Sequence, residues 1–389
     1  MNFRVKAVAG IALLLTGATT MELMGQRSNR VPSRLPRGIR SGEYVQVEGS
    51  THPKVARSRV GARLDAGQPL ERLMLVLKSS AEQQEALEQL LAEQHDPSSP
   101  RFNQWLTPEQ FGERFGPSAD DVATITNWLQ SQGLRVDEVA PGRRSIEFSG
   151  TVGQVEAAFH TQMNRVEVDG ESHIANTLPL EIPADLAPVV EGTLSLHDFH
   201  SKAMSHGVSE AQYTAGSSHY LSPNDYATIY NVRPLWTAGT DGTGQSIAVI
   251  SRTNVVGTDF TTFRSNMGLP ANPLQIVLNG ADPGIVRGDD VEADLDMEWA
   301  GALAKNAAVK LIVSKSTTTS DGIDLSAQYA VNNNSAPIIT ISYGACEAAM
   351  GSAGTTFYSN LWQQAAAQGQ SVFISTGDSG AAGCDSGTS

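Results

Sequence analysis

The fold class of this chain is decided by the stretch Val372-Phe373-Ile374-Ser375-Thr376-Gly377-Asp378-Ser379-Gly380. Its first three residues form a short apolar run of strand length, and a glycine-rich turn that carries an acid follows at once. Similar apolar runs occur three times earlier in the chain, at Ile247–Ile250, Val309–Val313 and Ile338–Ile341. Stretches with helical character separate these runs, at about residues 290–305, 320–333 and 355–368. Strands that alternate with helices predict an α/β domain whose parallel sheet is covered on both faces, with its working residues just beyond the carboxyl ends of the strands.

Residues 67–200 follow a different pattern, in which strands and helices alternate as two strand–helix–strand units. Strands are predicted at the apolar run Leu73–Leu77, at Ile146 and Phe148, and at the closing run Met163–Val168. Capping residues indicate three helix starts, at Ser79 with Glu82, Ser118 with Asp121, and Thr151 with Gln154. Thr107-Pro108-Glu109-Gln110, with proline in the first turn, indicates a fourth. This order predicts a small α+β domain of the ferredoxin-like type.

The segments outside these two domains are polar or have the pattern of a targeting signal. Residues 1–25 place two basic residues before an apolar run of about a dozen residues, as in a secretory signal peptide. We therefore expect a secreted product, extracellular or periplasmic. Residues 26–66 are basic and aperiodic, which predicts a mobile leader. Residues 201–220 are small and polar, which predicts a linker open to proteolytic processing before the α/β domain at residues 221–389.

Charge and cysteine content narrow the class of partner and the compartment. The formal net charge is -14, which argues against nucleic acid and anionic membranes because both bind basic surfaces. After the signal segment no run is apolar enough to form a membrane helix. The two cysteines, Cys346 and Cys384, form either one disulfide or two buried thiols. The oxidising surroundings of an exported protein favour the disulfide.

The α/β domain contains no histidine. All eight histidines precede Leu221, at positions 52, 95, 160, 173, 197, 200, 206 and 219. A Ser-His-Asp triad therefore cannot be assembled from residues 221–389. A general base in that region has to be a carboxylate or a lysine.

Carboxylates are dense in residues 289–303, with the sequence DDVEADLDMEWAGAL. On a helical wheel with Glu292 at 0°, Asp296 lies at about 40°, on the side of the apolar residues. Asp294 and Glu298 lie on the opposite side, at about 200–240°. We therefore expect the first pair to face the core and the second to face solvent. Two buried carboxylates one turn apart repel, so one keeps its proton and the pair can supply a general base and a carboxyl that orients it. The alternative is an acidic first turn stabilised by the helix dipole.

The turn after the strand Val372–Ile374 is open to three interpretations. Gly-Asp-Ser-Gly at residues 377–380 is the nucleophile string of chymotrypsin-like proteases, with Ser379 as the nucleophile, but that use requires a nearby histidine. Alternatively Asp378, protonated in acid, donates a hydrogen bond to a developing oxyanion. The third interpretation is a plain glycine-rich turn.

A second strand end also carries a candidate binding element. Ser342-Tyr343-Gly344 follows the run Ile338–Ile341. A strand end with a small residue can expose backbone groups to an extended peptide, so we expect these three residues to bind substrate.

Longer stretches resemble a known family. Residues of about 70–200 resemble the pro-kumamolisin activation domain, in HDPSSPRFNQWLTPEQFGERFGPS (95–118) and IEFSGTVGQVEAAFHT (146–161). Residues 221–389 resemble the first half of the sedolisin peptidase domain, in VEADLDMEWAGALA (291–304) and FISTGDSGAAGCD (373–385). After the first strand, where subtilisins have a catalytic aspartate, this chain has Arg252, which fits the sedolisin branch.

The resemblance implies a subtilisin-like fold for the second domain and a role for three acids. It implies that Glu292 is the general base, that Asp296 orients it, and that Asp378 is the oxyanion-hole acid. It also implies a calcium site near the C-terminus and a catalytic serine, with the residues of both beyond residue 389. Ser389 ends the chain only 11 positions after Asp378 (389 − 378), and we do not expect it to be the nucleophile.

The function that follows from the resemblance is a secreted, acid-active serine-carboxyl endopeptidase made as a zymogen. It would hydrolyse peptide bonds in proteins and would be inhibited by its own propeptide. The chain as written is expected to be truncated before its serine and to be inactive. The alternative is a non-catalytic exported pseudoenzyme or an inhibitor module of the propeptide type.

Overall fold

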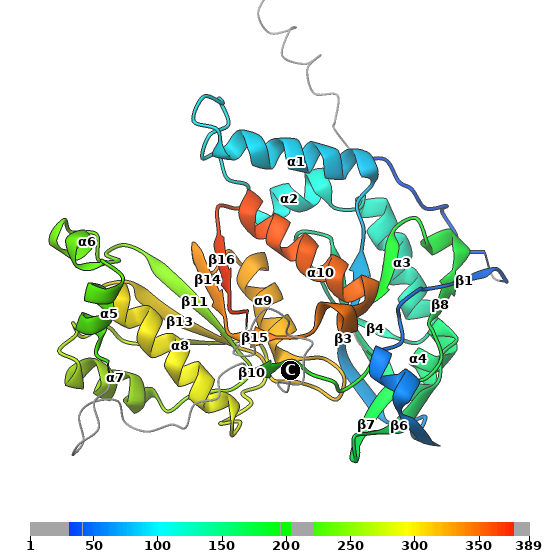
Figure 1. Ribbon diagram of the computed structural model, residues 1–389. Helices are drawn as coiled ribbons and strands as arrows, with labels where there is room; N and C mark the ends of the chain where they lie inside the picture. The colour runs from blue at the N-terminus through cyan, green and yellow to red at the C-terminus, as the bar shows by residue number, and fades with distance from the viewer. Residues whose placement is uncertain (1–30, 41, 195, 204–220, 377–389) are drawn as a thin grey trace, which may run out of the picture.

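The computed structural model describes residues 31–40, 42–194, 196–203 and 221–376. Figure 1 shows an N-terminal α+β domain beside a C-terminal α/β domain, with helix α10 between the N-terminal helices and the parallel sheet. The predicted signal peptide, most of the linker, Asp378, Cys384 and Ser389 lie outside the described residues. None of the described helices is long and apolar enough to cross a membrane.

The N-terminal domain is built on a four-stranded antiparallel sheet. The elements of this domain are β1 (Tyr44–Gln46), η1 (Pro53–Arg57), β2 (Arg59–Arg63), β3 (Pro69–Leu77), α1 (Ala81–His95), α2 (Pro108–Phe115), α3 (Ala119–Ser131), β4 (Arg135–Val139), β5 (Ser145–Thr151), α4 (Val152–Phe159), β6 (Met163–Val168), β7 (Glu171–Asn176), β8 (Glu181–Pro183), η2 (Ala184–Leu186) and β9 (Val190–Thr193). The main sheet has the strand order β4-β5-β3-β9, with α1 to α3 before β4 and α4 before β9. This is the predicted ferredoxin-like arrangement.

The closing strand of that sheet is β9 and not Met163–Val168, so this part of the prediction is wrong. Met163–Val168 does form a strand, β6, but it pairs with β2 and β7 in a separate three-stranded sheet. Alternation of apolar residues identifies a strand but carries no information about which edge the strand joins.

Three of the four predicted helix starts are confirmed by their caps. Thr107 and Thr151 form capping boxes with Gln110 and Gln154, and Ser118 accepts from the Asp121 amide. The first helix starts one residue later than predicted, because Ser80 and Gln83 form its capping box. The Ser79 hydroxyl instead donates to the Phe115 carbonyl of α2.

The predicted mobile leader over residues 26–66 is wrong for residues 44–63. Strand β1 pairs with β8, and β2 pairs with β6, both antiparallel. Basic, aperiodic sequence gave no strand signal there, because these strands take their order from partners more than 100 residues further along the chain.

The C-terminal domain contains the predicted parallel sheet. Its elements are β10 (Lys202–Ala203), α5 (Pro223–Ile229), α6 (Arg233–Thr237), β11 (Ser246–Ser251), α7 (Gly257–Asn266), β12 (Gln275–Leu278), α8 (Asp289–Leu303), β13 (Ala308–Val313), α9 (Gly322–Asn332), β14 (Ile338–Ile341), β15 (Tyr343–Gly344), α10 (Glu347–Ala367) and β16 (Ser371–Ile374). The sheet order is β12-β13-β11-β14-β16, and every pairing is parallel. Residues of α7 and α8 pack on one face of the sheet, and residues of α9 and α10 pack on the other. The α/β class expected of a subtilisin-like domain is confirmed.

Helix and strand positions in this domain agree closely with the sequence pattern, with two exceptions. The edge strand β12 and the helices α5 to α7 were not predicted. Helix α10 begins at Glu347, earlier than the predicted start near residue 355, and contains a kink at Gly351 with φ 67°. A side chain at that φ would be strained, so glycine permits the kink.

Strand β3 joins the two domains through its two faces. Leu73, Leu75 and Leu77 point into the core of the N-terminal domain. Met74 and Val76, on the opposite face, belong to the core cluster around α9 and α10 of the C-terminal domain. The unbroken apolar run at this strand is therefore explained by burial on both faces.

Candidate functional site

The predicted carboxylate pair lies on α8, next to the end of strand β14. Glu292 is 4% exposed. One turn later, the Oδ1 atom of Asp296 accepts a 2.6 Å hydrogen bond from the hydroxyl of Ser342. The other oxygen, Oδ2, is buried and has no hydrogen-bond partner. The structure thus brings Asp296 and Ser342 together, which the sequence had indicated as two separate elements.

One carboxyl of this pair, that of Asp296, has a raised pKa. Burial raises the pKa of Asp296 to about 7, the Glu292 charge adds to this, and the bond from Ser342 opposes it. Asp296 is therefore the carboxyl that keeps its proton in weak acid, as expected for neighbouring acids in a buried place. A protonated Asp296 can hold an ionised neighbour in place by donating a hydrogen bond, which is the arrangement a carboxylate base needs.

The core-facing side of α8 differs from the predicted one. The residues that pack on the sheet are Ala293 and Met297, with Ala300 and Ala304 against them. On the wheel this stripe is centred about 100° from Glu292 and Asp296. The pair lies at the flank of the buried stripe, because Trp299 packs against Tyr226 of α5 and not against the sheet. A helical wheel shows which side of a helix is apolar, but it does not show whether that side packs on a sheet or on a neighbouring helix.

The second acidic pair occupies the other flank of α8, facing α7. Asp294 and Glu298 are half-buried, so the prediction that they face solvent is wrong. Burial raises the pKa of Asp294 to about 6 and that of Glu298 to about 8, with Asp259 of α7 contributing to both.

The strand that follows Ser342 is paired with another segment of the same chain. Lys202–Ala203, which form β10, run antiparallel to β15, with Lys202 opposite Gly344 and Ala203 opposite Tyr343. These two residues were predicted to be the start of the linker, and they are a strand. The tail of the N-terminal domain (residues 199–203) therefore lies along Ser342-Tyr343-Gly344, the element that was predicted to bind an extended peptide.

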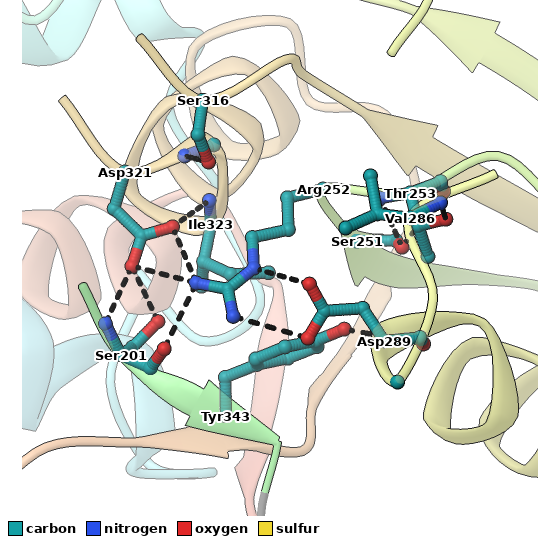
Figure 2. Close-up of polar contacts among 12 residues, drawn as sticks. Ser201, Ser251, Arg252, Thr253, Val286, Asp289, Ser316, Asp321, Ile323 and Tyr343 are labelled. Atoms are coloured by element: carbon teal, nitrogen blue, oxygen red, sulfur yellow. Dashed lines mark hydrogen bonds and ion pairs between the residues drawn. The ribbon is translucent and has the colours of Figure 1, made fainter. Parts of the chain in front are cut away.

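An ion-pair cluster surrounds Ser201, the residue that precedes strand β10 (Figure 2). Arg252, which follows β11, makes two bonds to Asp289 at 2.8 and 3.0 Å. Its Nη1 atom lies 3.2 Å from the nearer oxygen of Asp321 and donates to the Ser201 carbonyl at 2.9 Å. The guanidinium also lies over the ring of Tyr343, at 5.1 Å from the centroid. Because all of these groups belong to ends of strands and helices, they converge at the carboxyl edge of the sheet.

Sequence reasoning missed this cluster. Arg252 was noted only as a residue that is not an aspartate, and Asp289 and Asp321 were not singled out. The available signals were the position of Arg252 directly after a predicted strand and that of Asp321 at the start of a predicted helix, which it caps by accepting from the Ile323 amide at 3.0 Å.

A cavity of about 680 Å³ adjoins the paired strands. Tail residues Phe199, His200 and Ser201 form one side, and Tyr343 with residues of α10 forms another. The carboxyl of Asp324 lies in its wall, where burial raises its pKa to about 7.

The remaining predicted residues are only partly described. Cys346 is disulfide-bonded, and its predicted partner Cys384 lies outside the described residues. Asp378 and Ser379 lie outside them as well. The calcium ligands were expected beyond residue 389, and within the described residues no group of three or more His, Cys, Asp or Glu side chains could hold a metal ion.

Comparisons with known proteins show which families the two domains resemble. Residues 56–199 match the family model described as the pro-kumamolisin activation domain. The chain is 29% identical over 310 residues to sedolisin from Pseudomonas sp. (strain 101), covering 77% of this chain and 52% of that protein. It is 30% identical over 367 residues to xanthomonalisin from Xanthomonas sp. (strain T-22), covering 87% of this chain and 43% of that protein.

Two further relatives belong to the same group. Kumamolisin from Bacillus sp. (strain MN-32) is 27% identical over 296 residues, covering 72% of this chain and 52% of that protein. The solved structure of Pseudomonas sedolisin, a serine-carboxyl proteinase, matches 44% of this chain and 46% of its own with 26% identity and a TM-score of 0.36, too low a score to compare the two folds. The chain spans about half the length of the curated relatives it matches. Residues 56–199 are thus an activation domain of the pro-kumamolisin type, and most of the chain is similar in sequence to the peptidases sedolisin, xanthomonalisin and kumamolisin.

Proposed function

We propose that this chain is the precursor part of a secreted, acid-active serine-carboxyl endopeptidase, held inactive by its own activation domain. In this proposal Glu292 is the general base, Asp296 orients it, and Asp378 is the acid that donates a hydrogen bond to the oxyanion. The catalytic serine and the calcium ligands are assigned to sequence beyond residue 389.

The observation that carries the proposal is the position of Ser342. Its hydroxyl binds Asp296 of the carboxylate pair at 2.6 Å. The next two residues pair with the tail of the activation domain as antiparallel strands. A peptide strand and a buried carboxylate pair therefore meet at one residue, which is what a peptidase that uses a carboxylate base requires.

The same pairing supports inhibition by the activation domain. Lys202–Ala203 occupy the strand position that a substrate peptide would take. Main-chain pairing to an exposed strand edge gives affinity for any sequence, so the tail and a substrate compete for the same edge. Processing in residues 201–220 would remove the tail from this edge.

The acid requirement follows from the proposed roles. Asp296 has a pKa of about 7, so it is protonated in acid and can then serve as a hydrogen-bond donor beside Glu292, one turn away on α8. Turnover should therefore be highest below the pKa of Asp296, and it should fall as the pH rises through about 7 and Asp296 loses its proton.

The test is a pair of matched substitutions on α8 in the complete protein, including the sequence after residue 389. Glu292→Gln should abolish hydrolysis of a protein substrate at acid pH, because an amide cannot accept the proton. Glu298→Gln, on the opposite flank of the same helix, should leave turnover within about threefold of the wild type. Ordinary activity in the Glu292→Gln protein would refute the assignment.

A further inference from the structure

Arg252 and Asp321 bind both main-chain groups of a single residue in the tail, Ser201 (Figure 2). The Ser201 amide donates to Oδ2 of Asp321 at 2.8 Å, and Arg252 Nη1 donates to the Ser201 carbonyl at 2.9 Å. The Ser201 hydroxyl also donates to Oδ2 of Asp321, at 2.5 Å. One residue is thus bound through its N–H, its C=O and its side chain.

Residues outside the tail build this receptor completely. Two bonds from Asp289 fix the guanidinium of Arg252, whose side chain is only 14% exposed. The ring of Tyr343 lies against its face. Asp321 is 6% exposed and is fixed by its bond to the Ile323 amide at the start of α9. These contacts do not involve Ser201, so the receptor stays formed when the tail leaves.

The receptor lies in register with the peptide strand of the site. Ser201 directly precedes Lys202, which pairs with Gly344 of β15. If a substrate pairs with β15 in the same way as the tail, the substrate residue just before the paired strand lies between Arg252 and Asp321. Every amino acid can make both backbone contacts, apart from proline, which lacks the N–H. The contact of the side chain with Asp321 requires a hydroxyl on Cβ.

We propose that Arg252 and Asp321 form a substrate subsite that binds the main chain of the residue preceding the β15-paired strand and selects serine or threonine there. This inference rests on the proposed peptidase function, because it extends the position of Ser201 in the precursor to a substrate peptide.

The charge state of Asp321 suits acid conditions. Burial acts to raise its pKa, but the charge of Arg252, the Ser201 hydroxyl and His200 more than offset burial, so the pKa lies below its usual value. The carboxylate therefore remains an acceptor for the substrate N–H and hydroxyl at a pH where Asp296 is protonated. Hydrogen bonds to a charged acceptor are about twice as strong as neutral ones, which makes the selection measurable.

The first experiment compares four peptides with the processed, complete enzyme. They are identical except at the residue in question, which is Ser, Ala, Thr or Val. We expect kcat/KM to be about tenfold higher for Ser than for Ala and for Thr than for Val, the isosteric pair. Asp321→Asn should reduce both ratios to below about threefold, with the larger loss on the hydroxyl peptides. Equal hydrolysis of all four peptides by the wild type would overturn the inference.

The second experiment needs no catalysis and uses the uncleaved chain. Hydrogen exchange of the Ser201 amide is measured in the wild type, in Ser201→Ala and in Asp321→Asn. Asp321→Asn should speed exchange at this amide more than Ser201→Ala does, since the alanine variant keeps the bond from the amide to the carboxylate. If the Asp321→Asn protein folds normally and the protection of the Ser201 amide is unchanged, the subsite is refuted.

The two experiments separate the subsite from the proposed function. If the wild type cleaves none of the peptides or proteins tested, the peptidase proposal fails and the exchange measurement alone judges the receptor. If it cleaves them without preference, the peptidase proposal stands and the subsite does not.

Discussion

Lowering the pH from 7 to 5 should destabilise the activation domain, because two buried histidines resist protonation in the folded state and accept protons when the chain unfolds. His52, the N-cap of η1, and His197 lie 4.7 Å apart between ring centroids, and His52 also packs against Phe199 at 4.5 Å. Burial lowers the pKa of His52 to about 4 and that of His197 to about 3.

The groups around this pair oppose protonation. Lys54 and Arg57 of η1 and His173 of β7 act on His52, and His52, His200 and Lys54 act on His197. Asp198, next to His197 in the chain, is bound to His173 at 3.0 Å.

The sign and size of the effect follow from proton linkage. In the unfolded chain both histidines titrate near 6.5, so between pH 6.5 and about 4 the unfolded state binds more protons than the native state. Stability is therefore fully present above about pH 6.5 and falls as the pH decreases. For His52 alone the loss between pH 7 and pH 5 is about 2 kcal/mol, at about 1.4 kcal/mol for each pH unit below 6.5.

The assay is urea unfolding at pH 7 and pH 5 of the wild type and of the double variant His52→Asn, His197→Asn. Asparagine can still accept the local bonds that the two rings accept from the Lys54 and Phe199 amides, but it cannot become charged. The double variant should lose at least about 2 kcal/mol less than the wild type over this pH step. His95→Asn, an exposed position on α1, is the matched control and should behave as the wild type. Equal losses in the wild type and the double variant would show that the cluster does not carry the acid response.

Two further predictions concern stability. Met74 is 2% exposed where β3 meets the C-terminal domain, so Met74→Ala should lower the free energy of unfolding by about 2–5 kcal/mol. Val60→Ala, at a residue that is 52% exposed, is the control and should change it by less than about 0.5 kcal/mol. Similar losses in both variants would refute the role of β3 at the interface. The pKa of Glu298 is raised to about 8 in the native state, so between pH 4.5 and 8 ionisation of this carboxyl lowers the free energy of unfolding. Glu298→Gln should therefore stabilise the protein at pH 7 by roughly 1–3 kcal/mol and leave its stability unchanged at pH 4. The same difference between variant and wild type at both pH values would contradict this.

Much of the architecture could be predicted because it depends on local patterns. Apolar runs of strand length became β11, β13, β14 and β16, and capping residues became the starts of α2, α3 and α4. These features need only the chemistry of a few neighbouring residues. Where the physical cause lay in a distant partner, prediction failed, as for β1 and β2, whose partners β8 and β6 lie more than 100 residues away.

The candidate site divides in the same way. The spacing of Glu292 and Asp296 placed them one turn apart on a helix, and the structure keeps them so. Glu292 is buried and Asp296 largely buried, as predicted, but the side of α8 that packs on the sheet was misjudged, because apolar residues of α8 are shared between the sheet and the helix α5. A wheel computed from one helix cannot show which neighbour covers which side.

The sequence by itself thus determined the class of the two domains, the absence of histidine from residues 221–389 and the carboxylate pair on α8. Only the tertiary structure decided that Ser342 binds Asp296, that the tail pairs with β15 and that Arg252, Asp289 and Asp321 surround Ser201. The physical reason is that these contacts join residues between 37 and 142 positions apart, as for Arg252 with Asp289 (289 − 252) and Lys202 with Gly344 (344 − 202). Spacing along the chain carries no information about such pairs until the sheet brings the ends of its strands to one edge.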